Sequence, residues 1–324
     1  MDNPYRLYDQ SRLAAEIKAN LPVERAAPKT GWPSSGARIE RNHPFLATRA
    51  CGSAWGGSFT FGDDVPDDKA WPYLASVKLG CEIANFGIDG FGFDQSLLFF
   101  QEHLPHQSVV ILGMAQPMIT VGVASSLAFL DLRDHLPQAK TTKPFFTLDS
   151  GALMLEPRPT PTVDAIWAHY GKDGYGRDWT PLRFPFSISV ALAIYRKLTR
   201  PNIVQMSPMS DHPEMAKQRE LASLEIIEMA NVAQQNNDRF AVLLIPRPQD
   251  SVNPDAAFVS MLNSLAARAP EACLIDPSQE LRLAAVSLST PDAIRTTTGH
   301  FSSAGNAALA QALVRGLASC GIKP

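Results

Sequence analysis

Short apolar runs alternate with longer helical stretches from about residue 45 onward, and no other feature of the chain constrains its fold more. Apolar runs of strand length that are separated by helices of about ten residues or more predict a parallel sheet with both faces covered. The strands are expected at 45–51, 82–87, 108–113, 240–245 and 272–275, and the helices at 69–79, 93–103, 214–236, 254–268 and 303–318.

Two segments do not follow this alternation. Residues 1–44 predict an N-terminal extension, with a short amphipathic helix at about 8–21 and then a linker rich in proline, glycine and serine. Residues 117–213 carry many prolines and clustered aromatic side chains, which favours an insertion that acts as a cap. The domain expected at 45–324 therefore contains 117–213 as an insertion. The aromatic residues of the insertion, together with Asp173, Arg177 and Asp178, could line a sugar-binding surface or form the core of the cap itself.

Composition excludes several classes of partner. The chain has 324 residues, of which 45% are hydrophobic and 19% charged, so it can bury a large core. A net charge of -3 gives no electrostatic reason to expect nucleic acid or an anionic membrane as a partner. Residues 1–27 lack the apolar region of a signal peptide, and no apolar stretch is long enough to span a bilayer. No metal or cofactor is expected, because no cluster has metal-ligand spacing and no glycine loop is of the phosphate-binding kind.

The four cysteines are scattered along the chain without a Cys-x-x-Cys spacing. They are Cys51, Cys81, Cys273 and Cys320. This pattern favours reduced, buried thiols, and with it a cytoplasmic location.

Residues 56–62 read Gly-Gly-Ser-Phe-Thr-Phe-Gly, at a point where a strand is expected to end and a helix to follow. Such a turn exposes the hydroxyl of Ser58 and places its backbone N–H near a helix start, where developing negative charge is favoured. Taken alone, the segment could equally be a glycine-serine turn without any chemistry.

Two later segments strengthen the interpretation of this turn. Residues 84–92 read Ala-Asn-Phe-Gly-Ile-Asp-Gly-Phe-Gly, and residues 299–306 read Gly-His-Phe-Ser-Ser-Ala-Gly-Asn before the last helix. With 56–62, in this order and at these spacings, they resemble three sequence blocks of the SGNH, or GDSL-type, hydrolase superfamily. The resemblance extends from about residue 45 to the end. It implies a three-layer α/β/α fold of flavodoxin type, with a central parallel sheet of about five strands.

The resemblance also implies roles for individual residues. Ser58 would be the nucleophile and His300 the base that takes its proton. The backbone N–H groups of Ser58 and Gly90 would form the oxyanion hole, where a glycine lets the acyl oxygen approach closely.

The chain departs from the family pattern at three places. Gly57 replaces the aspartate that usually precedes the serine. Gln116 stands where an asparagine is usual, and it could donate a third oxyanion hydrogen bond or be an ordinary loop residue. The acid expected two or three residues before the histidine is absent.

The residues at those two positions before the histidine are Thr297 and Thr298. A hydroxyl or a main-chain carbonyl can hold the imidazole tautomer, and Asp292 is the nearest upstream carboxylate. The adjacent Asp63 and Asp64 are assigned to the loop that follows the serine turn, and not to a metal site.

These residues predict a serine hydrolase that uses a Ser58–His300 dyad to cleave an O-acyl ester, expected to be acetyl, of a carbohydrate or small metabolite. The carbohydrate hint comes from similarity to bacterial proteins that share the first block and a Lys-Pro-Phe-Phe segment, here 143–146. Two alternatives stay open. A sugar hydroxyl that intercepts the acyl-enzyme would make the protein an O-acyltransferase, and an inactive descendant would bind a glycan or a partner protein. The sequence does not indicate an oligomeric state.

Overall fold

The computed structural model describes residues 7–9, 50–104, 107–122, 142–158, 162, 164–165, 180–199, 213–248, 256–288 and 291–323. The chain divides into two compact units. One consists of Met1–Ala37 and Thr120–Leu221, and the other of Arg38–Ile119 and Ala222–Pro324. The second unit contains the parallel sheet and the candidate site.

The central sheet has five parallel strands in the order β3-β2-β4-β8-β9. An order in which the first strand of the sheet lies between the second and the third is the flavodoxin-like arrangement. The strands are β2 (Ala50–Gly56), β3 (Glu82–Gly87), β4 (Val109–Ala115), β8 (Arg239–Ile245) and β9 (Cys273–Ile275). The expected fold class is confirmed.

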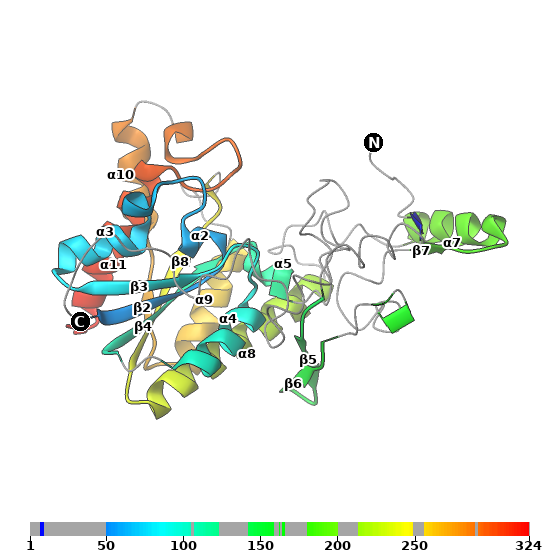
Figure 1. Cartoon of the computed structure of the whole chain (residues 1–324), viewed down its shortest axis with the longest axis horizontal. Helices are drawn as coiled ribbons and strands as arrows, with labels where there is room; N and C mark the ends of the chain where they lie inside the picture. Colours follow the sequence, from blue (N-terminus) through cyan, green and yellow to red (C-terminus); the bar gives the residue numbers. More distant parts are fainter. Residues whose placement is uncertain are drawn as a thin grey trace. The chain divides into compact units, whose positions relative to one another are not determined.

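Helices cover both faces of this sheet (Figure 1). Helices α3 (Trp71–Leu79) and α11 (Ser303–Ser319) pack together on one face, with α10 (Ser278–Ser287) against α11. The other face carries α4 (Phe93–His103), α8 (Pro213–Gln235) and α9 (Ala256–Arg268). Right-handed crossovers in this strand order require this distribution. All five expected helices are present, whereas α10 was not expected.

Trp55 is the centre of the aromatic core on the α4 side of the sheet. Its indole is fully buried and stacks on Phe86, with ring centroids 4.4 Å apart, and it meets Phe99 and Phe100 edge-on at 5.5 and 5.1 Å. The indole N–H donates to Ser53 Oγ at 2.8 Å, so the polar atom of this large side chain is satisfied. This packing fixes β2 firmly just before the strand delivers the chain to the site.

A glycine lies at or near the carboxyl end of each of the three strands that lead to the site. Gly56 is paired in register with Gly87 on one side and Gly113 on the other. A Cβ at any of the three would overlap Thr60 or Phe61 of the next helical turn, and the φ of Gly56, 149°, also favours glycine. The row of glycines therefore lets the turn that carries the serine lie directly on the strand ends.

The position of the first strand was predicted wrongly. It was expected at 45–51, but the strand runs Ala50–Gly56, and residues 45–49 lie outside the described residues. The segment Gly-Ser-Ala-Trp-Gly looks like a turn because glycine and serine disfavour strands, yet burial on both faces of a central strand overrides that propensity.

The helix expected at 8–21 is also corrected at its start. Leu7–Asp9 form a short strand, β1, which pairs in parallel with β7 (Thr180–Leu182), and the rest of that segment lies outside the described residues.

The cysteines are paired, so the expectation of reduced thiols is wrong. Cys51 bonds to Cys81, and Cys273 bonds to Cys320. Both disulfides lie where β2, β3 and β9 begin, at the edge of the sheet opposite the candidate site. Sequence spacing gave no sign of this pairing because the fold brings the partners together: Cys51 and Cys81 meet at the starts of neighbouring strands, and Cys320, after α11, meets Cys273 at the start of β9.

The other unit contains a β-hairpin of β5 (Phe145–Asp149) and β6 (Ala152–Glu156), and the helix α7 (Phe186–Thr199). Of the aromatic residues expected to form a cap core or a sugar surface, Phe184 and Phe186 are exposed, and those at 167–179 lie outside the described residues. The cap role of 117–213 stays a prediction. Among the described helices, none combines the length and the apolar character needed to cross a membrane.

Candidate active site

Ser58 is the first residue of α2 (Ser58–Phe61), a single helical turn that follows β2 after one intervening glycine. Gly62 ends this turn in the left-handed conformation, with φ of 83°, and its N–H donates to the Ser58 carbonyl at 2.8 Å. Thr60 holds the turn down, because its Oγ1 lies 3.4 Å from the carbonyl oxygens of Trp55 and Gly113. The serine is therefore presented at the carboxyl edge of the sheet, where open α/β folds bind ligands.

The loops after β2, β3 and β4 meet at Gly57. A Cβ at this position would lie 2.8 Å from the carbonyl oxygen of Phe91 and 3.5 Å from Met118 Cγ. The N–H of Ile88 also donates to the Gly56 carbonyl at 3.0 Å, which ties the second loop to the first. The aspartate that is usual before the serine would collide with Phe91 here, so the loop packing itself calls for glycine at position 57.

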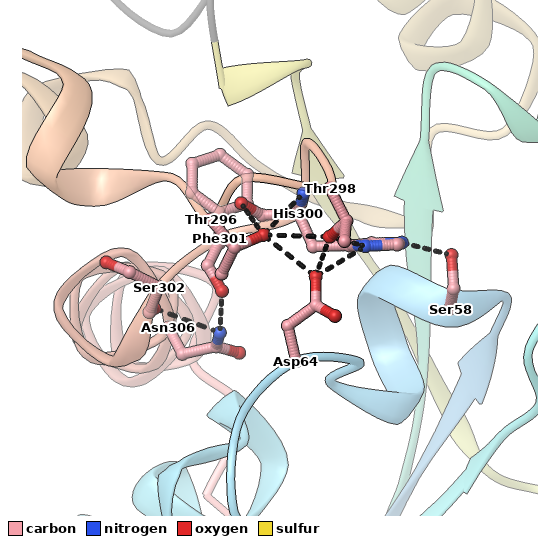
Figure 2. A network of polar contacts seen from close by, with 8 residues as sticks. All are labelled: Ser58, Asp64, Thr296, Thr298, His300, Phe301, Ser302 and Asn306. Atoms are coloured by element: carbon pink, nitrogen blue, oxygen red, sulfur yellow. Dashed lines mark hydrogen bonds and ion pairs between the residues drawn. The ribbon is translucent and has the colours of Figure 1, made fainter.

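The imidazole of His300 lies beside the serine hydroxyl, with 2.9 Å between Nε2 and Ser58 Oγ (Figure 2). The histidine sits at the end of a tight hairpin in which Arg295 and Phe301 form an antiparallel bridge and Gly299 turns with φ of 96°. Helix α11 begins two residues after Phe301. The distance of 2.9 Å is within reach for proton transfer from the hydroxyl to the ring.

The second ring nitrogen of His300 faces a carboxylate that was not expected there, that of Asp64 (Figure 2). Nδ1 lies 3.1 Å from Asp64 Oδ2. Asp64 follows α2 and adopts a left-handed φ of 68°, which turns the chain back toward the histidine hairpin. Ser58, His300 and Asp64 thus form a hydrogen-bonded series with the geometry of a Ser-His-Asp triad.

Two hydroxyls contact the same carboxylate oxygen. Thr296 Oγ1 donates to Asp64 Oδ2 at 2.8 Å, and Thr298 Oγ1 donates to it as well. Burial raises the pKa of Asp64, but the hydrogen bonds from Thr298, Thr296 and His300 outweigh it, so the net pKa lies below the ordinary value. The carboxylate therefore stays ionised, and because it can only accept, it places the proton of the neutral imidazole on Nδ1. Nε2 is then free to accept from Ser58.

A second set of contacts joins the serine turn to the histidine loop behind the triad. Asn306 is buried and donates through Nδ2 to the carbonyls of Phe301 and Ser302, at 3.0 and 3.1 Å (Figure 2). Its Oδ1 accepts from the backbone N–H of Trp71 at 3.1 Å, and the indole of Trp71 donates to the Phe59 carbonyl at 3.1 Å. This chain of hydrogen bonds fixes the two halves of the site relative to each other.

The histidine ring also packs on an aromatic side chain. The ring of Phe59, next to the serine, lies 4.8 Å from the imidazole centroid of His300. The side chains of His300 and Asp64 are 21% and 29% exposed, so the triad is open to a substrate but shielded on its inner side.

Of the three residues expected to orient the histidine, one lies in the hydrogen-bond network. Thr298 lies in the network, with its Oγ1 3.4 Å from His300 Nδ1 in addition to its contact with Asp64. Thr297 is exposed and makes none of these contacts. The side chain of Asp292 lies outside the described residues.

The expected oxyanion donors lie on the loops that meet at Gly57. Gly90 is in the loop after β3, with φ of 75°, one residue before Phe91. Gln116 directly follows β4, is 1% exposed, and its backbone N–H donates to the Ile245 carbonyl at 3.2 Å. Its side-chain Nε2 is buried without a hydrogen-bond partner among the described residues. A buried amide donor of this kind is a group for which a bound acyl oxygen would supply the missing acceptor.

Sequence reasoning missed Asp64 and Thr296. A signal for Asp64 was available, since a glycine that ends a one-turn helix sends the next residues back toward the same sheet edge. The absence of any acid in the histidine block should then have drawn attention to the carboxylates beside the serine. Thr296 has no comparable signal, because only the hairpin geometry turns its hydroxyl toward Asp64.

Comparisons with known proteins add little to this geometry. No protein-family model matches the chain, and the curated proteins contain no significant match. Solved structures with some similarity include a protein assigned to the G-D-S-L family of lipolytic proteins from Desulfitobacterium hafniense DCB-2. It has a TM-score of 0.39 and 12% identity, over 82% of this chain and 98% of that one. A second solved structure has a TM-score of 0.43 and 13% identity, over 82% and 95% of the two chains. Similarity at this level carries no argument, so the case for an SGNH-type α/β fold rests on the sequence blocks, strand order and side-chain geometry of this chain.

Proposed function

We propose that the protein is a serine hydrolase of the SGNH type, in which Ser58 is the nucleophile, His300 the general base and Asp64 the acid that orients it. The observation that carries this proposal is the continuous relay from Ser58 Oγ to His300 Nε2, 2.9 Å, and from His300 Nδ1 to Asp64 Oδ2, 3.1 Å. Acyl transfer at serine requires these roles in this order. The dyad expected from the sequence is thereby extended to a triad.

The reaction proceeds through an acyl-enzyme. Ser58 Oγ attacks the ester carbonyl carbon while His300 Nε2 takes the hydroxyl proton, and the ionised Asp64 stabilises the imidazolium. The bond to the alcohol oxygen then breaks, and His300 gives that oxygen the proton. Water attacks the acyl-enzyme in the same way, its proton passing to His300, and the carboxylic acid and free Ser58 are released.

The oxyanion hole would consist of the backbone N–H groups of Ser58 and Gly90, with the Gln116 amide as third donor. The buried, unpartnered Nε2 of Gln116 beside β4 supports its inclusion. Removal of one oxyanion donor costs on the order of 100- to 1000-fold in rate. We therefore expect Gln116→Leu to react that much more slowly than the wild type.

The substrate we propose is an O-acyl ester, with acetyl as the acyl group, of a carbohydrate or small metabolite. This class rests on the sequence resemblance, and so does the alternative in which a sugar hydroxyl replaces water as acceptor. An inactive binding protein is the weaker alternative, because drift after loss of activity has no reason to keep a serine and an aspartate of one loop in a hydrogen-bonded relay with a histidine from the other end of the chain.

We further propose that the protein works in an oxidising compartment. The cytoplasmic expectation depended on reduced cysteines, and that support is gone because Cys51–Cys81 and Cys273–Cys320 are disulfides. Structural disulfides persist outside the reducing cytoplasm in most organisms.

A fluorophosphonate probe tests the proposed chemistry without knowledge of the substrate. The probe phosphonylates an activated serine with loss of fluoride, and mass spectrometry locates the modified residue. We expect modification of Ser58 in the wild type and none in Ser58→Ala or His300→Ala. Folded wild-type protein that stays unmodified would overturn the proposal. Unlabelled wild-type protein would then be screened against acetylated sugars, with release of acetate as the signal.

A further inference from the structure

Two threonine hydroxyls converge on the carboxylate oxygen of Asp64 that faces the histidine. Thr296 and Thr298 both lie on the hairpin that leads to His300, and both donate to Asp64 Oδ2 (Figure 2). Thr297, between them, is exposed and outside the network. The backbone N–H of Thr296 donates to the His300 carbonyl at 2.8 Å, which closes the hairpin and turns these two hydroxyls toward the acid.

The protons of the two hydroxyls can be assigned from their surroundings. Thr296 Oγ1 accepts from the backbone N–H of His300 at 3.2 Å. The acceptors within reach of its single proton are Asp64 Oδ2 at 2.8 Å, Thr298 Oγ1 at 3.0 Å and the His300 carbonyl at 3.3 Å. Thr298 Oγ1 has three acceptors within reach: Asp64 Oδ2, Thr296 Oγ1 at 3.0 Å and His300 Nδ1 at 3.4 Å. An ionised carboxylate only accepts and is the stronger acceptor, so both hydroxyl protons and the Nδ1 proton point to the same oxygen.

This arrangement decides the tautomer of the imidazole. With the Thr298 proton held by Asp64, His300 carries its proton on Nδ1 and offers Nε2 to Ser58. A Thr298 hydroxyl that donated to Nδ1 would instead leave the ring proton on Nε2, where it blocks acceptance from the serine.

We propose that Thr296 and Thr298 are positioning residues that hold the Asp64 carboxylate in place and so fix the reactive tautomer of His300. The proposal rests on the proposed function and deepens it, since it explains how a carboxylate from the serine loop serves a histidine at the other end of the chain. Asp64 is on an exposed loop and has no helix to fix it, so the two hydroxyls supply the constraint. The lowered pKa of Asp64 is consistent with three donors on its carboxylate.

The first test compares phosphonylation rates of five single variants. Thr296→Val and Thr298→Val each remove a donor to the charged carboxylate, and we expect each to react roughly 10-fold more slowly than the wild type. Thr297→Val is the matched control and should react at the wild-type rate. Thr296→Ser and Thr298→Ser keep the hydroxyl and should retain most of the activity. Rates in both valine variants equal to that of Thr297→Val would overturn the proposal.

The second test measures the tautomer directly and does not depend on activity. Protein with ¹⁵N-labelled histidine is examined by two-bond ¹H–¹⁵N NMR correlation at about pH 8.5, where an imidazole is neutral. The His300 signals are assigned by their absence in His300→Ala. We expect a proton on Nδ1 in the wild type and in Thr297→Val, and a shift toward the Nε2–H form in the Thr296→Val/Thr298→Val double variant. An unchanged Nδ1–H tautomer in the folded double variant would contradict the inference.

The two proposals fail in different ways. Absence of wild-type phosphonylation would refute the hydrolase, while the NMR tautomer would still decide the role of the threonines. Normal wild-type reaction with no effect of either threonine would refute the threonine role alone.

Discussion

Gly57 shows how tightly single residues are constrained at this site. A Cβ at residue 57 would lie 2.8 Å from the Phe91 carbonyl, which belongs to a backbone that cannot yield cheaply. We therefore expect Gly57→Ala to lose about 1–3 kcal/mol in the free energy of unfolding and to slow phosphonylation of Ser58. Urea denaturation and the probe reaction measure the two effects.

Gly80→Ala is the matched control for that variant. Gly80 has a φ of 71° but open space around its Cβ position, so alanine there brings only backbone strain. Its stability should fall, and its phosphonylation rate should stay at the wild-type value. If Gly57→Ala reacts as fast as Gly80→Ala, the close packing of the loops does not matter for the nucleophile.

Asp64 gives a pH dependence whose sign follows from its lowered pKa. Burial raises this pKa, but the hydrogen bonds from Thr298, Thr296 and His300 together lower it by more, so the folded value lies below the unfolded one. The carboxylate therefore contributes stability that is fully present above the unfolded pKa, about 3.9, and is lost as pH falls through the folded pKa.

The measurement is urea denaturation of the wild type and Asp64→Asn at several pH values from 3 to 7. The advantage of the wild type in the free energy of unfolding should be constant above about pH 5 and shrink below about pH 4. An advantage that grows as the pH falls would show that the carboxylate is not stabilised by its partners.

The sequence pointed to the proposed nucleophile and base but not to the proposed acid, and the reason lies in distance along the chain. Ser58 and His300 stand in recognisable blocks, whereas Asp64 is separated from its histidine by 236 residues and lies in no block. Only the folded sheet edge brings them together. Thr297 illustrates the opposite error. It stands at a position where the family usually has the acid, and its hydroxyl could have held the imidazole, but it is exposed and outside the hydrogen-bond network.

At the scale of elements, the junction between α3 and α11 holds the histidine loop against the serine turn. Asn306 on α11 accepts from the first N–H of α3, that of Trp71, and donates to two carbonyls of the histidine loop. Asn306→Ala would leave these buried groups without partners. We expect a loss of roughly 2–3 kcal/mol in the free energy of unfolding and slower phosphonylation. Asn231→Ala, at an exposed position on α8, is the control and should change neither the free energy of unfolding nor the phosphonylation rate. Equal changes in the two variants would exclude a specific role for the junction between α3 and α11.

Elements with a clear period were predicted well, and those with mixed signals were not. Strand β3 and helix α4 match their expected ranges, because their apolar spacing is unambiguous. Strand β2 was displaced because its glycines and serine resemble a turn, although one of them, Gly56, is what allows α2 to lie on the strand end. At Gly56, close packing against Thr60 excludes the larger side chains that are usual in strands.

At the scale of the whole molecule, the two disulfides fix one edge of the sheet while the triad lies on the other. Their partners are 30 and 47 residues apart, so each bond should contribute roughly 3–4 kcal/mol by restricting the unfolded chain. Reduction, or paired Cys→Ser substitution, should lower the unfolding temperature while leaving the phosphonylation rate of the folded protein near the wild-type value.

The pairing itself is checked by thiol titration in urea without reductant. We expect no free thiols and disulfide-linked peptides that contain Cys51 with Cys81 and Cys273 with Cys320. Four free thiols in freshly isolated protein would contradict both the pairing and the proposed oxidising compartment. The cysteine positions in the sequence could not have shown this, because pairing depends on which strand and helix ends become neighbours in the fold.

The central claim is that Asp64 completes a triad with Ser58 and His300, and the phosphonylation rate of Asp64→Asn against the wild type tests it most directly. Asparagine keeps the shape but cannot stabilise the imidazolium or enforce the Nδ1–H tautomer. We predict a rate lower by on the order of 10³- to 10⁴-fold, with the fold retained. A folded Asp64→Asn variant that reacts at the wild-type rate would contradict the triad and return the site to a Ser58–His300 dyad.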